Sequence, residues 1–301
     1  MLIDKKTLIK IRKYKSIYLM FIPIAIYFIV FSYYPLILGI ISSFRESILI
    51  GTPKFVGIEN YKNVLSNPLY SEAFVNTIIV NFLTFVVQFV FSLFIALSLN
   101  EVKNKMIRSS IQTVTYIPNL LSWAIVGGMW IRILSPTGML NNILKLIYGN
   151  NFNPIVFMAE PRFARTIMVL TGAWKGAGYF AVLLLTAIVS IDQSIYESAS
   201  IDGATRFKQI VYITVPNLVP TMKVITVLGS MNFLRNFDQI FIMGNANIYS
   251  KVRNLLYLIY TEGIVNFKIG IATAAATMVL IATFIISTIV RRLTRYDETF
   301  N

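Results

Sequence analysis

Long apolar runs alternate with short polar segments along most of this chain. Six of these runs are, by residue number, 17–44, 71–100, 109–131, 166–191, 217–237 and 269–290. Charged residues within them are few, namely Glu72, Lys175, Lys223 and Arg235. An α-helix needs about 20 apolar residues to cross ~30 Å of hydrocarbon. The pattern therefore predicts an all-α, polytopic membrane protein with six transmembrane helices.

The composition supports this prediction and narrows the chemistry. Of the 301 residues, 56% are hydrophobic and only 13% are charged, which is typical of a membrane protein. Cysteine and histidine are both absent. Their absence excludes disulfides, thiolate or imidazole metal sites and a histidine-based catalytic triad. We expect neither a metal site nor catalytic residues in this chain.

The net charge of +14 comes largely from basic residues between and beyond the apolar runs. With six spans, the N-terminal tail, the connections 101–108 and 192–216 and the C-terminal tail all lie on one side. The positive-inside rule assigns that side to the cytoplasm. We expect an N-in, C-in protein with a cytoplasmic tail 1–16, a transmembrane domain 17–293 and a second cytoplasmic tail 294–301.

The stretch YESASIDGATRFKQIVYITVP, residues 196–216, interrupts the apolar pattern with a charged, helix-forming segment. Ser194 and Glu197 have the S-x-x-E spacing of a capping box, which predicts the start of a short helix. Gly203 is expected to end it, because glycine tolerates a left-handed backbone. A second helix then runs to a break at Pro216, and its apolar face is formed by Phe207, Ile210 and Val211. On local physics alone, a helical hairpin that merely connects two spans fits equally well.

This segment resembles the EAA loop of ABC importer permeases, whose pattern is E-A-A-x3-G-x9-I-x-L-P. Every spacing agrees, with Ser198 in place of the second Ala and Val215 in place of the Leu. Three further stretches resemble the carbohydrate-uptake, maltose-permease-like branch of that family: FVGIENYKNV (55–64), Asn76-Thr77 and IQTVTYIPNLLSW (111–123). Within this branch the chain is most similar to permeases for oligosaccharides and polysaccharide fragments, over nearly its whole length.

The resemblance implies the fold of a type I ABC importer permease in a bacterial cytoplasmic membrane. It also implies that the loop couples the permease to an ATPase, through Glu197, Ser198, Ala199, Asp202, Gly203, Ile213 and Pro216. The chain has no G-x-x-x-x-G-K-[ST] motif for binding ATP, so ATP-Mg is expected on two partner ATP-binding subunits and not on this chain. The other expected partners are a second, non-identical permease and an extracellular substrate-binding protein, which docks on outward loops. The expected function is import of a saccharide by alternating access, and this subunit is not an enzyme.

A substrate path is predicted from polar residues in spans four and five. Asn232, Arg235, Asn236 and Gln239 recur at i, i+3, i+4 and i+7, the spacing of one helical face. Lys175 is the only charge in span four, and helical rise places it at a similar depth. We expect a polar cavity where the amides meet sugar hydroxyls and Lys175 or Arg235 meets an acidic or polar sugar. In the structural alternative, either cation pairs with Asp238 or extends to the membrane surface.

Three questions of function and assembly stay open at this point. An ABC permease for an amino acid or phosphate would have the same architecture, and a membrane-embedded enzyme is a remote alternative. The small residues of spans four and six permit close helix packing. Such packing would serve either the partner permease or this chain alone; the residues are Gly172, Gly176, Gly178, Ala272, Ala274, Ala275 and Ala276.

Overall fold

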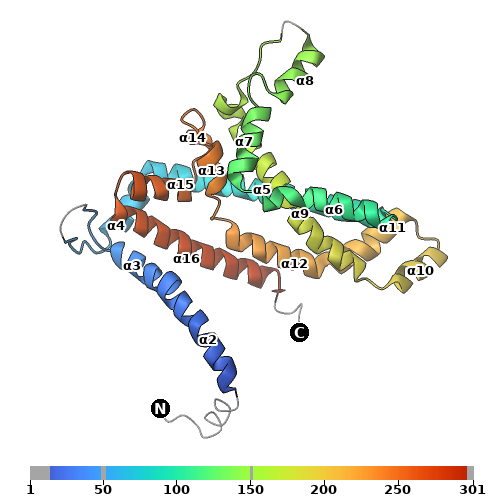
Figure 1. The fold of residues 1–301 in the computed structure, drawn as a ribbon, viewed down its shortest axis with the longest axis horizontal. Helices are drawn as coiled ribbons and strands as arrows, with labels where there is room; N and C mark the ends of the chain where they lie inside the picture. Colours follow the sequence, from blue (N-terminus) through green and yellow to red (C-terminus); the bar gives the residue numbers. More distant parts are fainter. Residues whose placement is uncertain (1–13, 49–51, 150–151, 297–301) are drawn as a thin grey trace. The chain divides into compact units, whose positions relative to one another are not determined.

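The structure is a computed structural model that describes residues 14–48, 52–149 and 152–296 (Figure 1). The described residues form helices and connections, with no β-strand beyond one isolated bridge between Arg45 and Phe55. The all-α prediction is therefore confirmed. Most of the predicted tail 1–16, and the end of the tail 294–301, lie outside the described residues.

The helices fall into two halves of the chain. The first half contains α2 (Lys15–Phe28), the π-helical η1 (Ile29–Tyr33), α3 (Tyr34–Ser42), α4 (Glu59–Ser66), α5 (Pro68–Glu101), α6 (Lys105–Leu120), α7 (Trp123–Ile133) and α8 (Met139–Tyr148). The second contains the 3₁₀ turn η2 (Phe157–Ala159), α9 (Pro161–Val189), α10 (Gln193–Ile201), α11 (Arg206–Gln209), the π-helical η3 (Ile210–Thr214), α12 (Val215–Asn232), α13 (Asp238–Met243), α14 (Tyr249–Val252), α15 (Leu255–Tyr260), the π-helical η4 (Thr261–Val265) and α16 (Ile269–Leu293).

Five helical stretches of the described chain are long and apolar enough to cross a membrane. They are Lys15–Ser42, Pro68–Glu101, Pro161–Val189, Arg206–Asn232 and Ile269–Leu293. These five correspond to five of the six predicted spans. The third predicted span, 109–131, is broken: α6 and α7 meet at 101° and make a sixth span if they are counted together. The chain bends at Leu121, whose extended backbone (ψ 146°) ends α6.

The prediction of a break at Pro216 is wrong. One helical stretch runs from Arg206 to Asn232, with a π-helical turn at Ile210–Thr214 and Pro216 at the start of α12. Inside a regular α-helix a proline removes a backbone hydrogen bond and clashes with the preceding turn, but here the turn directly before Pro216 is π-helical, with the N–H of Val215 bonded to the Ile210 carbonyl. A single π turn inside an α-helix is a known irregularity, often found at functional sites. The segment 206–215 is therefore helically continuous with span five.

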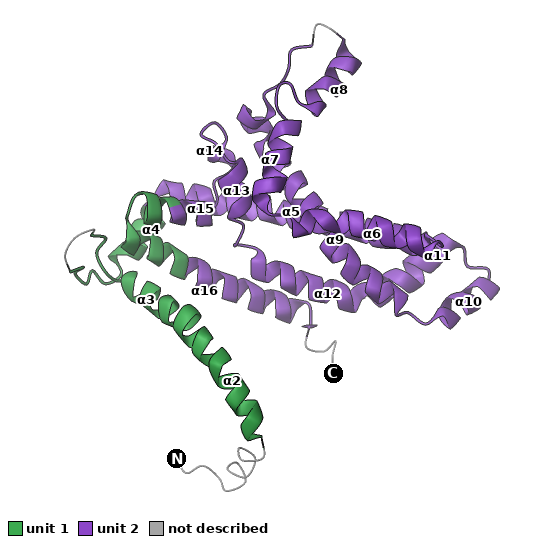
Figure 2. Ribbon diagram, viewed as in Figure 1, with its two compact units in different colours: residues 1–66, 261–277 green, residues 67–260, 278–301 purple. Residues whose placement is uncertain are grey.

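The chain divides into two compact units, residues 1–66 with 261–277 and residues 67–260 with 278–301 (Figure 2). In the first unit, Asn60 is buried and donates hydrogen bonds to the carbonyls of Ser43 (2.9 Å) and Arg45 (2.8 Å). The Ser43 and Tyr61 hydroxyls are also hydrogen-bonded, at 2.6 Å. These bonds fasten α4 to the end of α3. By contrast, no residue of α2 is buried in the described structure.

In the second unit, α5 and α9 pack side by side and α12 joins them (Figure 1). One buried apolar cluster includes Ala96, Leu184, Leu218 and Ile225 from these three helices. α9 also packs closely against α6. A Cβ at Gly178 would collide with the backbone carbonyl of Thr115. At this position the small-residue face of span four packs within the chain.

Asn76 and Thr77, which were part of the family resemblance, fasten a distant segment to α5. The Asn76 side chain donates to the carbonyls of Ser250 and Arg253, both at 3.2 Å. The Thr77 hydroxyl accepts the backbone N–H of Leu255 at 3.0 Å. Both side chains are almost completely buried. This pair holds the connection between spans five and six against the start of span two.

Candidate functional site

A polar cavity of about 490 Å³ lies in the second unit. Its lining comes from α5 (Asn81, Thr84, Phe85, Gln88), the bend between α6 and α7 (Asn119, Trp123), α9 (Gly172, Lys175, Gly176, Tyr179, Phe180) and α12 with the following segment (Leu228, Gly229, Asn232, Phe233, Asn236, Gln239). The volume lies within the range of roughly 300–1,000 Å³ that is typical of ligand cavities. Four parts of the membrane domain therefore converge on one hollow.

Lys175 projects from α9 to the bend between α6 and α7. Its ammonium donates to the carbonyls of Pro118 (3.1 Å) and Asn119 (3.0 Å) and lies 5.7 Å from the ring centroid of Trp123. The last carbonyls of a helix have no intrahelical partner, and a cation at this end is favoured by the helix dipole. Lys175 therefore caps α6 at the break. Within the described residues, no ion pair joins Asp238 to Lys175 or Arg235.

Amide side chains form a hydrogen-bonded network along one wall. Gln239 is only 1% exposed and donates to the Met168 carbonyl (2.7 Å) and the Thr171 hydroxyl (2.9 Å). Asn236 donates to Gln239 Oε1 (2.9 Å) and Asn81 Oδ1 (3.2 Å). The network fixes these amides in place, so the cavity wall is ordered before any ligand arrives.

The predicted helical face at the end of span five is wrong. α12 ends at Asn232 and α13 begins at Asp238, so the residues between them follow a turn and not a helix. Asn232, Asn236 and Gln239 nevertheless line the cavity together with Lys175. Arg235 does not: it is exposed and is absent from the lining.

Sequence reasoning missed the wall that α5 contributes. Asn81, Thr84 and Gln88 are polar positions inside an otherwise apolar run, and their spacing of three and four residues puts them on one helical face. That pattern could have identified the wall. Glycines on the opposite helices leave room for it. A Cβ at Gly176 would lie 2.5 Å from the Gln88 side chain, and one at Gly229 would collide with Phe85.

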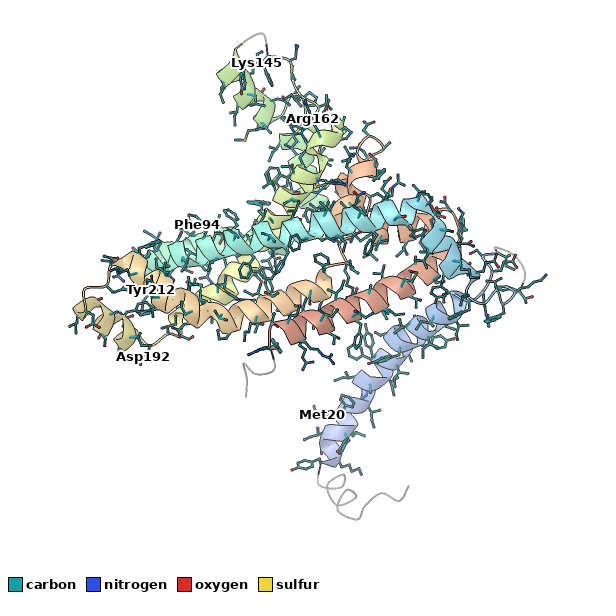
Figure 3. The ribbon with its side chains drawn as sticks, turned by 180° about the vertical axis from the view of Figure 1, so that it is seen from behind. Met20, Phe94, Lys145, Arg162, Asp192 and Tyr212 are labelled. Carbon is teal, nitrogen blue, oxygen red and sulfur yellow. The ribbon has the colours of Figure 1, made fainter. Side chains whose placement is uncertain are left out.

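The segment 192–216 forms a second candidate site. The N-cap of α10 is Asp192, whose carboxylate accepts the backbone N–H of Ser194 at 2.9 Å. The predicted capping box of Ser194 and Glu197 is therefore wrong. Hydrogen bonds from Ser194, chiefly from its backbone N–H, hold the pKa of Asp192 below its ordinary value. Asp192 and Tyr212 lie at the same end of the second unit (Figure 3).

The turn at Gly203 has the predicted geometry. Gly203 has a φ of +78°, and the N–H groups of Gly203 and Ala204 donate to the carbonyls of Ser200 (3.1 Å) and Ala199 (2.8 Å). This pair of bonds is a Schellman motif. Asp202 occupies the C-cap of α10. The first helix of the segment therefore ends at Gly203, as predicted.

Hydrogen bonds connect α10 to the start of the fifth span. The hydroxyls of Tyr196 and Thr214 are 2.9 Å apart, and the buried Gln209 donates to the Ser200 hydroxyl at 2.8 Å. Glu197 is exposed, and Ile201 and Phe207 are 87% and 74% exposed. α10 is thus hydrogen-bonded to the helical stretch that continues into α12, whose end lines the cavity.

The other predicted coupling residues lie on the same connected segment. The Ser198 hydroxyl donates a hydrogen bond to the Ser194 carbonyl at 2.9 Å. Ile213 belongs to the π turn and Pro216 to α12. The structure describes no group of three or more Asp and Glu residues, the only ligand types of this kind in the chain, that could hold a metal ion. The described geometry is that of a polar cavity and an exposed helical segment.

Comparison with known proteins shows the family to which the chain belongs. The family model "Binding-protein-dependent transport system inner membrane component" matches residues 88–296. The polygalacturonan/rhamnogalacturonan transport system permease protein YteP of Bacillus subtilis (strain 168) is 28% identical over 97% of this chain and 91% of its own length. The trehalose/maltose transport system permease protein MalF of Thermococcus litoralis is 29% identical, with 92% and 94% covered.

Solved structures agree with the sequence relatives. A crystal structure of a bacterial ABC transporter involved in the import of the acidic polysaccharide alginate has a chain that superposes with a TM-score of 0.88 at 29% identity, covering 97% of this chain and 99% of that one. A crystal structure of the bacterial alginate ABC transporter in complex with an alginate pentasaccharide-bound periplasmic protein gives 0.87 at 29% identity, with 95% and 96% covered. The chain belongs to the family of binding-protein-dependent transport system inner membrane components; it is a multi-pass transport subunit of the cytoplasmic membrane with the fold of type I ABC importer permeases, and not an enzyme.

Proposed function

We propose that this chain is the permease subunit of an ATP-driven importer that carries an oligosaccharide through the cavity around Lys175 and Asn232. The observation that carries the proposal is the amide-rich and aromatic lining of that cavity. The relatives support the same conclusion, because those named above are permeases or importers for saccharides. ATP hydrolysis and alternating access would then move the sugar inward.

The lining suits a saccharide better than the alternative solutes. Amide groups both donate and accept hydrogen bonds, as sugar hydroxyls require, and Trp123, Tyr179 and Phe180 offer flat apolar faces. A zwitterionic amino acid needs partners of both signs, but the lining contains no Asp or Glu. Phosphate carries more charge than the single lysine can balance. The geometry therefore favours a hydroxylated ring over an amino acid or phosphate.

The segment 192–216 is proposed as the contact with the ATPase. An exposed helix with charged Glu197 and apolar Ile201 and Phe207 is suited to dock in a cleft of a soluble protein. The partners are then two ATP-binding subunits that hold ATP-Mg, a second permease and an extracellular binding protein. The topology is N-in and C-in. Because the chain has no cysteine, labelling of a single Ser198→Cys variant by an impermeant thiol reagent, only from the cytoplasmic side, tests this orientation.

Uptake by the reconstituted complex tests the function. The tagged chain is purified from native membranes with its partners and placed in vesicles that contain ATP, and accumulation of labelled oligosaccharides, amino acids and phosphate is measured with the binding protein outside. We expect copurification of a different permease and an ATPase, and ATP-dependent accumulation of a saccharide only. Accumulation of an amino acid or phosphate, or transport by this chain as a homodimer, would contradict the proposal.

A further inference from the structure

The cavity lining has an unbalanced charge. Lys175 is its one charged residue, and no Asp or Glu contributes to it. Asp238, next to the lining residue Gln239 in sequence, acts electrostatically on Lys175. However, it is exposed, lies outside the lining and forms no ion pair with Lys175 among the described residues. We propose that the saccharide carried by this permease bears a carboxylate, and that the ammonium of Lys175 recognises it. This inference rests on the proposed function and names its substrate class.

The ammonium is already oriented for such a ligand. A lysine ammonium has three N–H donors. Two of them bond the carbonyls of Pro118 and Asn119, at 3.1 and 3.0 Å. These bonds fix the nitrogen at the edge of the cavity and leave the third N–H for a ligand. Since a fixed donor loses little freedom when it binds, its contribution to affinity is larger than that of a mobile lysine.

The carbonyl partners do not cancel the charge of Lys175. The C-terminal end of a helix carries a partial charge equivalent to about half a unit of negative charge, whereas the ammonium carries a full positive charge. A net positive potential therefore remains in a cavity whose other polar groups are neutral. A carboxylate has the opposite sign to this potential, and a charge-assisted hydrogen bond is about twice as strong as a neutral one.

The remaining lining is suited to the rest of a uronate ring. Asn81, Gln88, Asn232 and Asn236 present amides from both sides of the cavity, and Trp123 presents a ring next to the ammonium. Hydroxyls of the sugar would bond the amides while the carboxylate meets Lys175. A neutral sugar would satisfy the amides equally well but would offer the ammonium no negative charge within the cavity. The site therefore distinguishes the two classes through one residue.

The test compares two probes that differ in charge and in one methyl group on each carboxyl. Equilibrium binding of trigalacturonate and of its fully methyl-esterified form is measured on the assembled complex in lipid nanodiscs, without the binding protein. We expect the unmodified complex to bind the acid roughly 10- to 100-fold more tightly than the ester, as for a hydrogen bond to a charged group. Lys175→Met should abolish this preference and Lys175→Arg should retain most of it. Lys223→Met, which removes a lysine of span five outside the lining, is the matched control and should change nothing.

The outcomes separate this inference from the proposed function. Equal binding of the two probes to the unmodified complex overturns the inference, and so does a preference that survives in Lys175→Met. The first comparison requires no variant, so it decides even where replacement of Lys175 prevents assembly. If the acid is not preferred but neutral oligosaccharides are still accumulated, the proposed function stands and only the substrate class is wrong. If no saccharide of either class binds or is accumulated, both fail.

Discussion

Replacement of Gly203 by valine tests the turn that ends α10. Gly203 has a φ of +78°, and a Cβ built there has no neighbouring atom within 4 Å. The variant therefore introduces no collision, and its effect comes from the backbone alone. An L-residue in the left-handed region loses about 1–2 kcal/mol, and a β-branched residue is especially unfavourable there. A change of 1–2 kcal/mol alters an equilibrium by a factor of about 5–30.

This strain should appear as a loss of coupling. The turn positions α10 through the bonds from Gly203 and Ala204 to the carbonyls of Ser200 and Ala199. If α10 must keep this geometry to dock on the ATPase, Gly203→Val should lower substrate-stimulated ATP hydrolysis and uptake by about 5- to 30-fold. Assembly in the membrane and basal ATP hydrolysis should change little. Both are measured on the purified complex in vesicles.

Two variants make the result specific. Asparagine adopts the left-handed conformation more readily than other residues, so Gly203→Asn should recover most of the activity. Gly149 also has a positive φ (+82°) and open space around a Cβ, but it follows α8 outside the coupling segment. Gly149→Val should therefore leave coupling intact. Normal stimulated hydrolysis in Gly203→Val, or an equal loss in Gly149→Val, would refute the reasoning.

Two further predictions concern stability, measured as thermal unfolding of the complex in detergent. Gly178→Ala should lower the free energy of unfolding by about 1–3 kcal/mol, because backbone atoms of α6 must move to admit the new Cβ. Gly128→Ala in α7, where nothing lies within 4 Å, should be neutral, and equal stability of the two variants would argue against backbone contact between α6 and α9. Gln239→Leu should also lower the free energy of unfolding by about 1–3 kcal/mol, because the substitution leaves buried polar partners unpaired. Unchanged unfolding would show that the amide network does not stabilise the cavity wall.

The spans could be predicted from sequence because the requirement is one of length and polarity. A helix without charges over about 20 residues can cross the hydrocarbon whatever its neighbours are. The bend in the third span could not be predicted in the same way. The run 109–131 is uncharged throughout, and Pro118 inside a helix is compatible with a kink or with a full break. Whether the helix kinks or breaks depends on which donors and acceptors elsewhere in the fold can bond the freed backbone groups.

The segment 192–216 contains one feature that local sequence patterns predict and two that they do not. A left-handed residue at a helix end strongly favours glycine, so the turn at Gly203 was predicted correctly. The start of α10 was not, because Asp192 and Ser194 are both good capping residues and the sequence alone does not rank them. The break expected at Pro216 did not occur because a π turn precedes it. Such a turn leaves no clear mark in the sequence.

The break in span three and the lysine in span four are two parts of one structural feature. At membrane depth, non-helical backbone is tolerated only where protein or a water-filled cavity satisfies it. The carbonyls of Pro118 and Asn119, where α6 ends, need hydrogen-bond donors, and the Lys175 ammonium supplies them. A lysine at the centre of a spanning helix costs about 2.5–3.5 kcal/mol in isolation, and these two bonds offset much of it. The break therefore stabilises the cation, and the cation stabilises the break. Together they place a fixed positive charge in a cavity whose other walls are neutral amides and rings. A cation at this position can both cap α6 and attract an anion, which an uncharged residue cannot do.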